Sequence, residues 1–471
     1  MNSNLQPGDV IDGFTLGERL HGGGMGIIFR ATPPAGRADL DFPLLVKVPR
    51  LGPGEPSETV VTYEVEAMVH AALSGPHVPR FVAAGDLAVQ PYLVMEFVEG
   101  ASLRQWTGKG PLEAAEVARL GAAVARAVHA LHLQEVVHLD LKPGNVIFRP
   151  TGEAVLVDFG LSRHAHFPDL LAEEFRHPMG SGPYISPEQV LGVRQDPRSD
   201  VFALGVILYE LATGRYPFGA PTSQRALRHR LWHIPVSPRR LATGCPEWLQ
   251  QVILRCLEAQ AADRYASAAQ VAADLTHPEQ VTVGERGRRL RRPGLGTLLK
   301  RWIMATGYEP SPPDRPSQQL ATASIVLAAV ATRHKNEQRF QVLREVVKRL
   351  LAIDPDRRLT CVTVIAPASE LAGGKEEDSG TARRIKHLVR LRNWAEPLEL
   401  PPERISYHVI ESGDPAAALL EYARVNQVDH VVIGAPPADV PMKGSFVSTR
   451  VAAEAPCSVT VVRPRAGSSE S

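Results

Sequence analysis

The chain has few cysteines. Only four occur among 471 residues, and no two of them form a Cys-x-x-Cys pair. This spacing argues against a zinc ribbon, a redox dithiol motif and a disulfide framework. We therefore expect free and mostly buried thiols in a reducing cytoplasm, at Cys245, Cys256, Cys361 and Cys457.

The chain also lacks an excess charge and a long apolar run. Lysine and arginine number 52 against 51 acidic residues, a net charge of +1, which gives no general attraction to nucleic acid or membranes. The longest apolar stretch, Leu320 to Thr332, is too short to span a bilayer. The first seven residues have neither a basic region nor an apolar core, so we expect no secretory signal and no transmembrane segment.

The chain length predicts two or three domains. Residues 10–100 show apolar runs broken by glycine and proline, with one helical stretch near 58–73. Residues 101–276 instead repeat apolar residues at three and four spacing, which predicts helices at 114–133, 200–213, 247–259 and 267–275. A small β-rich lobe followed by a large helical lobe predicts a bilobal α+β domain over residues 10–276.

Two further segments follow. Residues 277–318 are rich in arginine and proline and predict a basic linker, with a short helix around 295–305. This linker is either a solvated spacer or a docking patch for an anionic membrane or an acidic protein face. Residues 319–465 alternate strands (324–331, 359–366, 405–411, 431–434, 459–462) with helices (336–353, 379–394, 414–426, 445–455). That alternation predicts an α/β domain with a doubly wound parallel sheet.

The most informative stretch is residues 138–148, His-Leu-Asp-Leu-Lys-Pro-Gly-Asn-Val-Ile-Phe, which Asp158-Phe159-Gly160 follows after one short hairpin. It places a carboxylate (Asp140), a cation (Lys142) and an amide (Asn145) on one loop, and a second carboxylate (Asp158) on the next. Phosphoryl transfer from ATP needs one group to orient a hydroxyl, one to neutralise the γ-phosphate and two to hold Mg²⁺. These residues therefore indicate that chemistry.

Upstream residues supply the remaining groups for a triphosphate. Small residues at Gly23 and Gly26 allow a close approach of the backbone to phosphate oxygens. Lys47 stands alone in the apolar run 43–49 and needs an anion beside it. Phosphates and a helix carboxylate would serve. The helical stretch near 58–73 offers Glu66 and, as the alternative, Glu64 for this role.

Together these motifs resemble the catalytic domain of bacterial-type serine/threonine protein kinases. The resemblance implies ATP and Mg²⁺, with Mn²⁺ as an alternative metal. It implies that Asp140 orients the substrate hydroxyl, Lys142 neutralises the transferring phosphate, Lys47 pairs with Glu66, and Asn145 and Asp158 bind the metal. The positions that would hold ATP are then Gly23, Gly26, Ile28, Lys47, Met95, Glu96, Val98 and Ile147.

Supporting positions follow the same family pattern. Glu188, in Ser-Pro-Glu, is expected to pair with Arg264, and Asp200 to brace the catalytic loop. Residues 180–184 resemble the loop that docks a protein substrate. Lys142, two residues after Asp140, follows the serine/threonine pattern.

Three positions depart from the family: His21, Leu45 and Leu139. The arginine that Leu139 replaces pairs with a phosphorylated activation loop. Between Asp158 and Ser186 the only hydroxyl residues are Ser162, Ser181 and Tyr184, none in mid-loop. We therefore expect activity with little dependence on phosphorylation of this loop. The departures leave two alternatives, a pseudokinase scaffold that binds ATP without turnover and, less favoured, a small-molecule kinase.

The C-terminal part resembles the universal stress protein family, in Val-Val-Ile-Gly at 431–434, Lys-Gly-Ser-Phe-Val-Ser at 443–448 and Ala-Pro-Cys-Ser-Val at 455–459. ATP-binding members carry an acidic residue where Ala331 stands and a glycine where Pro437 stands. We expect this domain to have lost ATP binding and to serve interaction, including a homodimer through its last strand. If nucleotide binds, the candidates are Gly434, Gly444 and Ser445. The whole chain then predicts a cytoplasmic protein kinase in signalling or stress response, with protein substrates including itself and no nucleic-acid partner.

Overall fold

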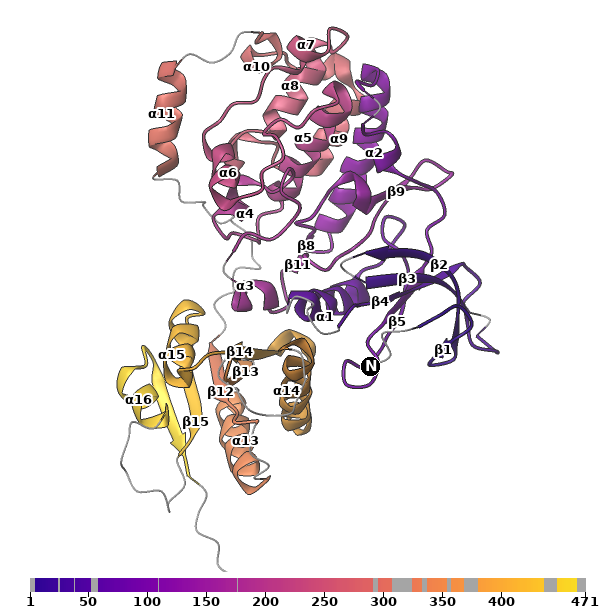
Figure 1. Ribbon diagram of the computed structural model, residues 1–471. Coiled ribbons are helices and arrows are strands. Elements are labelled where there is room, and N and C mark those ends of the chain that lie inside the picture. Colours follow the sequence, from indigo (N-terminus) through magenta and orange to yellow (C-terminus); the bar gives the residue numbers. More distant parts are fainter. Residues whose placement is uncertain are drawn as a thin grey trace, which may run out of the picture.

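The computed structural model describes residues 5–23, 26–37, 39–51, 58–108, 110–175, 177–290, 295–306, 324–332, 337–353, 357–367, 380–435 and 447–463. These residues form a bilobal N-terminal domain and a separate C-terminal α/β domain, which lies below the N-terminal domain in Figure 1. The fold predicted from the sequence is confirmed in both parts.

The small lobe is a six-stranded antiparallel sheet in the order β1-β2-β3-β4-β6-β5, with one helix beside it. In β4, Leu44, Val46 and Val48 are buried on one face while Leu45 and Lys47 point to the other. This alternation places Lys47 among the side chains between the sheet and helix α1. The elements are β1 (Val10–Ile11), β2 (Phe14–Gly23), β3 (Gly26–Thr32), β4 (Leu44–Val48), α1 (Glu58–Ala72), β5 (Phe81–Ala84) and β6 (Leu93–Glu96).

The large lobe packs its helices around α5 (Arg198–Thr213), which is buried along nearly its whole length. Helix α2 (Ala114–His132) presents a buried stripe at helical spacing to it. Gly121 permits the close approach, because a Cβ there would lie 2.3 Å from Leu208. The other helices are α3 (Leu170–Glu174), α4 (Pro187–Val190), α6 (Gln224–Arg228), α7 (Pro238–Leu241), α8 (Glu247–Cys256) and α9 (Ala268–Thr276).

Short strands of the large lobe carry the predicted catalytic loop. They are β7 (Ala101–Ser102), β8 (Val136–Val137), β9 (Val146–Phe148), β10 (Ala154–Leu156) and β11 (Arg163–His164). Strand β8 precedes the loop, β9 follows it, and the β9–β10 hairpin leads to Asp158.

The predicted linker begins with folded structure. Helix α10 (Glu285–Arg288) packs on α8, because the side chain of Gln250 donates to the carbonyls of Arg286 and Gly287 at 2.9 Å each. Helix α11 (Leu295–Thr306) lies where a short basic helix was expected. Among the described residues, no helix has both the length and the apolar character needed to cross a membrane.

The C-terminal domain is a five-stranded parallel sheet in the order β14-β13-β12-β15-β16. Along β12, Val326 and Ala328 join one apolar cluster and Leu327 the opposite one, so helices cover both faces. The strands are β12 (Ile325–Ala329), β13 (Arg358–Ile365), β14 (Ile405–Glu411), β15 (His430–Gly434) and β16 (Ser458–Val462); the helices are α13 (Glu337–Ala352), α14 (Gly380–Ala395), α15 (Pro415–Val425) and α16 (Val447–Glu454).

Candidate active site

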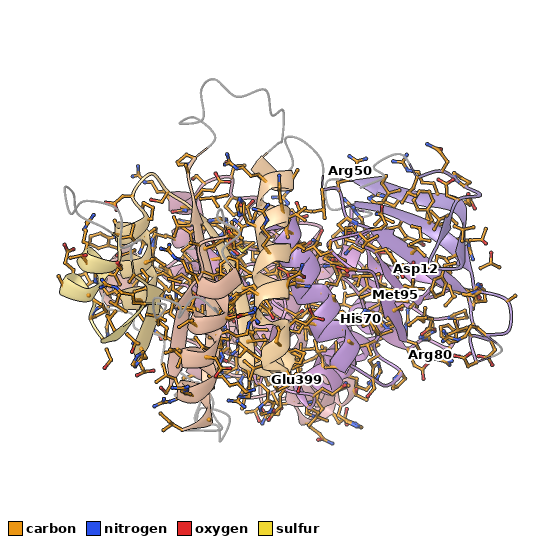
Figure 2. All side chains as sticks on the ribbon, turned by 90° about the horizontal axis from the view of Figure 1, so that it is seen from below. Asp12, Arg50, His70, Arg80, Met95 and Glu399 are labelled. Atoms are coloured by element: carbon orange, nitrogen blue, oxygen red, sulfur yellow. The ribbon has the colours of Figure 1, made fainter. Side chains whose placement is uncertain are left out.

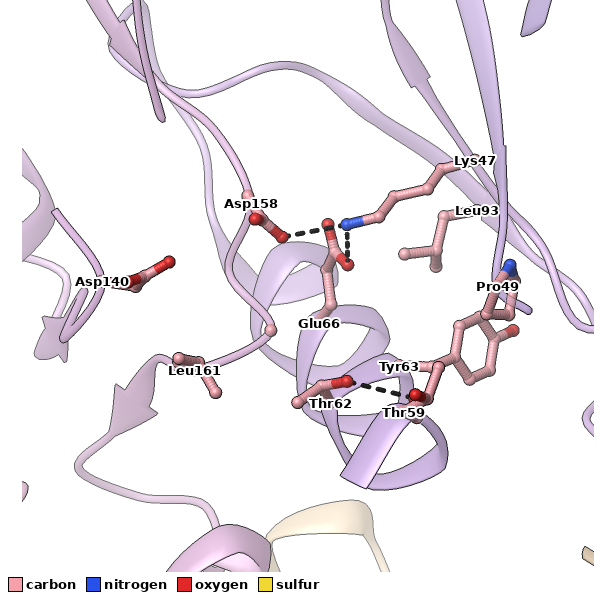
Figure 3. Close-up of a pocket in the computed structure, with 11 residues that line it drawn as sticks. Lys47, Pro49, Thr59, Thr62, Tyr63, Glu66, Leu93, Asp140, Asp158 and Leu161 are labelled. Atoms are coloured by element: carbon pink, nitrogen blue, oxygen red, sulfur yellow. Dashed lines mark hydrogen bonds and ion pairs between the residues drawn. The ribbon is translucent and has the colours of Figure 1, made fainter. Parts of the chain in front are cut away.

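Lys47 joins the two lobes at the site. Its Nζ donates to Glu66 Oε2 at 2.6 Å and to Asp158 Oδ1 at 2.9 Å (Figure 3). Burial alone would lower the pKa of Lys47, but the two carboxylates outweigh it and raise that pKa. Burial would likewise raise the pKa of Asp158, yet the Lys47 charge lowers it. The ammonium and the Asp158 carboxylate are therefore both charged at neutral pH.

The predicted catalytic loop converges on Asp140, which is 4% exposed. Lys142 Nζ donates to Asp140 Oδ2 at 2.6 Å, and Asn145 Nδ2 donates to the Asp140 carbonyl at 3.0 Å. From the loop at 180–184, the backbone N–H of Ser181 donates to Asp140 Oδ1 at 2.8 Å, and its hydroxyl accepts from Lys142 at 2.9 Å. The carboxylate of Asp140, the expected general base, thus contacts both Lys142, the expected phosphate ligand, and the loop expected to dock the substrate.

Asp200 holds the backbone of this loop. It accepts from the N–H groups of His138 at 2.8 Å and Leu139 at 2.9 Å, and from the ring of His132 at 2.9 Å. These bonds fix Leu139 at φ 63°, a conformation that non-glycine residues seldom adopt. Burial would raise the pKa of Asp200, but the His132 contact lowers it, so the brace is an anion.

Phe159 is buried between the two lobes. Its ring lies 5.3 Å from that of His70 on α1 and 5.5 Å from that of His138 in the catalytic loop. This packing fixes the residue next to Asp158, which itself has φ 69°. The Lys47–Asp158 contact is therefore held from both sides.

The predicted ATP-binding residues lie along the small-lobe sheet and the hairpin beneath it. Gly23 is opposite Gly26 at the end of the β2–β3 hairpin, whose tip, residues 24–25, is outside the described residues. Gly26 has φ 146°, and a Cβ there would lie 2.5 Å from the Val48 carbonyl. Ile28 is paired with Lys47 across β3 and β4. The close approach of the Val48 carbonyl therefore requires glycine at position 26.

The segment joining the lobes runs from β6. Met95 is opposite Leu45, and the Glu96 carboxylate accepts from Arg149 at 2.6 Å. Val98 is buried just beyond β6, and Ile147 lies in β9, opposite Val155 of β10. Sequence reasoning gave Glu96 a backbone role only. The structure adds an ion pair that ties this segment to the large lobe.

A pocket opens beside Lys47 (Figure 3). Its walls come from β4, α1, the catalytic loop and the segment after β10. Four predicted site residues line it: Lys47, Glu66, Asp140 and Asp158.

Every activation-segment hydroxyl before Ser186 is hydrogen-bonded within the fold. Ser162 donates to the His138 carbonyl at 3.2 Å, Ser181 is bound by Lys142, and Tyr184 donates to Glu210 at 2.7 Å. The predicted Arg264–Glu188 pair is fully buried at 2.7 Å. Along this described stretch, each hydroxyl that could be phosphorylated is therefore already engaged in a hydrogen bond.

Comparison with known proteins agrees with this geometry. A model of the protein kinase domain matches residues 48–276, and a model of the universal stress protein family matches residues 325–463. The chain carries a protein kinase domain and a universal stress protein domain. The kinase match begins just after Lys47, so the assignment of Gly23, Gly26 and Lys47 rests on the geometry above.

Among relatives of the kinase domain, the chain is 33% identical to serine/threonine-protein kinase Pkn1 of Myxococcus xanthus over 315 residues, which is 65% of this chain and 43% of that protein. It is 30% identical to PknB of Mycobacterium tuberculosis over 274 residues, 57% of this chain and 43% of that protein. It is 30% identical to PrkC of Bacillus subtilis over 258 residues, 54% and 39% respectively. The chain therefore spans less than half the length of these relatives.

Sequence reasoning missed one part of the kinase domain. The short helix α3 of the activation segment carries Glu173 and Glu174, whose side chains contact the universal stress domain. Two adjacent glutamates in a loop read as solvated charge, and no motif in the sequence distinguishes them. The nucleotide ligands predicted for that domain stay a prediction: Gly434 ends β15, while Gly444 and Ser445 lie outside the described residues.

Proposed function

We propose that this chain transfers the γ-phosphate of ATP to serine or threonine hydroxyls of proteins, including its own, in signalling or stress response. The observation that carries the proposal is the double contact of Lys47 Nζ with Glu66 and Asp158. It leaves the cation and the Asp158 carboxylate at one side of the pocket and Asp140 at the other (Figure 3).

The side chains fit a metal-bound triphosphate. Asp158 accepts from Lys47 through Oδ1, which leaves Oδ2 to bind a metal ion. Asn145 donates to Asp140 through Nδ2, which leaves its Oδ1 to bind the same ion. Oxygen donors of this kind suit Mg²⁺, with Mn²⁺ as an alternative. The bound metal would supply charge neutralisation at the phosphate oxygens.

The protein groups would then divide the remaining work. Asp140, held by Lys142 and the Ser181 N–H, accepts the proton of an incoming hydroxyl. Lys142 faces both Asp140 and the docking loop, where it can meet a transferring phosphate. Gly26 allows the backbone to lie close to the nucleotide.

Replacing Asp140 by Asn tests the proposal. Phosphorylation of a protein substrate with Mg-ATP should fall about 100- to 10,000-fold, because the general base is lost. ATP affinity should stay, because Lys47 and Asp158 are untouched. Asp263→Asn, the same change at an exposed aspartate of the large lobe, should leave the rate unaltered. Equal activity in Asp140→Asn and wild type, or none in either, would favour the ATP-binding scaffold.

A small-molecule kinase remains the weaker alternative. The docking loop at 180–184 is built into the site through Ser181, which favours a protein substrate. Product analysis with proteins, aminoglycosides and choline separates the two.

We further propose that activity needs little phosphorylation of the activation segment, because Leu139 cannot pair with a phosphate and the nearby hydroxyls are internally bonded. Phosphatase treatment should leave the rate nearly unchanged. A large loss that rephosphorylation of this segment restores would refute this.

For the universal stress domain we propose a homodimer through β16. This strand ends the sheet, and Val461 on it is 43% exposed. Sedimentation of wild type against Val461→Lys should show a dimer that the variant weakens. A monomer in both would refute it.

A further inference from the structure

The universal stress domain contacts the kinase domain at two elements that border the active site. Figure 1 shows α3 between the domains, and α3 lies against β14 of the sheet. In the view of Figure 2, the orange helices of the C-terminal domain lie beside the violet helix that carries His70, which is α1. We call these two contacts the α3 contact and the α1 contact.

The α3 contact is a buried polar socket for Glu173. One carboxylate oxygen meets Arg358 at 3.0 Å, and the other meets His408 at 2.8 Å. The second oxygen also accepts from the hydroxyls of Ser406 and Tyr422, at 3.1 Å each. A carboxylate removed from water is costly unless donors replace that water. These four donors all come from the universal stress domain.

Glu174 extends the socket to a second arginine. It contacts Arg384 of α14, and His408 lies between the two glutamates, 3.8 Å from Glu174 through its second ring nitrogen. Burial would raise the pKa of Glu173, but His408 and Arg358 lower it to about 2, so the socket holds an anion.

The α1 contact uses the helix that carries Glu66. Residues two apart on a helix point to different sides. Glu66 therefore faces Lys47, while Glu64 faces outward and pairs with Arg392 of α14. Val60 and Tyr63, on the same helix, belong to one apolar cluster with Ile385 and Leu388 of α14.

We propose that the universal stress domain positions the activation segment and α1 of the kinase for phosphoryl transfer, with Glu173 and Glu64 as the two points of attachment. In this docked arrangement Lys47 meets Glu66 at 2.6 Å and Phe159 is buried, so the site is aligned while the domain is engaged. In kinases with arginine at the position of Leu139, that arginine holds a phosphate on the activation segment. In this chain the anions on that segment are Glu173 and Glu174, and the cations Arg358 and Arg384 of the second domain hold them. This replacement explains how Leu139 is tolerated. The inference rests on the proposed kinase activity.

A charge swap across the α1 contact tests it in the full-length chain. Glu64→Arg and Arg392→Glu should each lower kcat about tenfold, with little change in KM for ATP. The double variant, which restores opposite charges, should recover most of the loss. A folding defect would not be repaired in this way. Glu454→Arg, which breaks an exposed 3.3 Å pair with Arg450 on α16, a helix that carries none of the residues of the two contacts, should leave kcat unchanged.

Hydrogen exchange supplies a readout that does not depend on catalysis. Peptides covering α1 and residues 165–175 should exchange faster in each single variant and regain protection in the double variant. Unchanged kcat and unchanged exchange in the single variants would overturn the inference, and so would a rise in kcat. If the wild-type chain transfers no phosphate, the proposed function fails, and exchange alone decides the inference.

Discussion

The buried Arg264–Glu188 pair offers the sharpest test of the physical reasoning. Both side chains are 0% exposed, with two contacts of 2.7 Å between them. Arg264 also donates to the carbonyls of Arg198, Glu258 and Ala259. Arg264→Met removes all of these and leaves the Glu188 charge buried. The Ser199 hydroxyl and the backbone N–H of Glu188 itself remain on that carboxylate.

The expected cost is about 3–5 kcal/mol, the usual range when one partner of a buried pair is removed. That is a large part of the roughly 5–15 kcal/mol by which domains are stable. The cost should also depend on pH. Burial would raise the pKa of Glu188, but Arg264 lowers it, so the wild-type pair adds stability above the ordinary carboxyl pKa. Without Arg264 the folded-state pKa rises, so the variant's deficit should shrink as the pH falls from 7 towards 4.

Native-state hydrogen exchange of peptides from α5 and α8 measures this cost in the large lobe separately from the other domain. The matched control is Arg119→Met, which breaks a pair of similar length (2.6 Å) with Glu116 on the exposed face of α2. It should cost about 0–1 kcal/mol. Adding Glu188→Leu to Arg264→Met should recover at least half of the loss. Equal costs for Arg264→Met and Arg119→Met, or no recovery in the double variant, would refute the reasoning.

Three further predictions concern the site, the joint between the lobes and the domain contact. Lys47→Met should lower kcat/KM about 100-fold or more, because the half-buried cation proposed to meet the phosphates is lost; a steady-state assay with a normal rate would contradict this. Gly100→Ala should lower Tm well beyond Gly152→Ala, which costs about 1 kcal/mol, because a Cβ at Gly100 would lie 1.9 Å from the Phe148 carbonyl while Gly152 has open space; equal Tm shifts would contradict this. Glu173, with its pKa lowered to about 2 from 4.5, should stabilise the domain contact fully above pH 4.5 and lose that effect as the pH falls towards 2; chemical cross-linking of the domains should follow this curve and lose it in Glu173→Gln.

Contacts between residues that lie close together along the chain could be predicted from the sequence. Asp140, Lys142 and Asn145 lie on one loop, so their mutual contacts follow from local geometry. The choice of Glu66 over Glu64 as the partner of Lys47 came from the offset that the kinase resemblance implies, and Lys47 lies 2.6 Å from Glu66. The alternation of strands and helices after residue 324 gave the parallel sheet, because period and element length are local properties of the chain.

The roles predicted for individual residues stay predictions, and so do the domain boundaries. The basic segment that follows residue 276 begins against the large lobe, where α10 packs on α8. A run of arginines indicates charge but not the surface on which it packs.

The sequence by itself predicted the groups proposed for phosphoryl transfer and the two folds, and it shows no hydroxyl residue in the middle of the activation segment. Only the tertiary structure decided how the two domains act on each other. Glu64 meets Arg392 across 328 residues of chain, and Glu173 meets His408 across 235. No motif or period relates such positions, because their contact depends on how two separately folded surfaces dock. The physical reason is burial. From the sequence alone a glutamate in a loop is expected to be solvated, and only the docked second domain shows that it is buried and hydrogen-bonded.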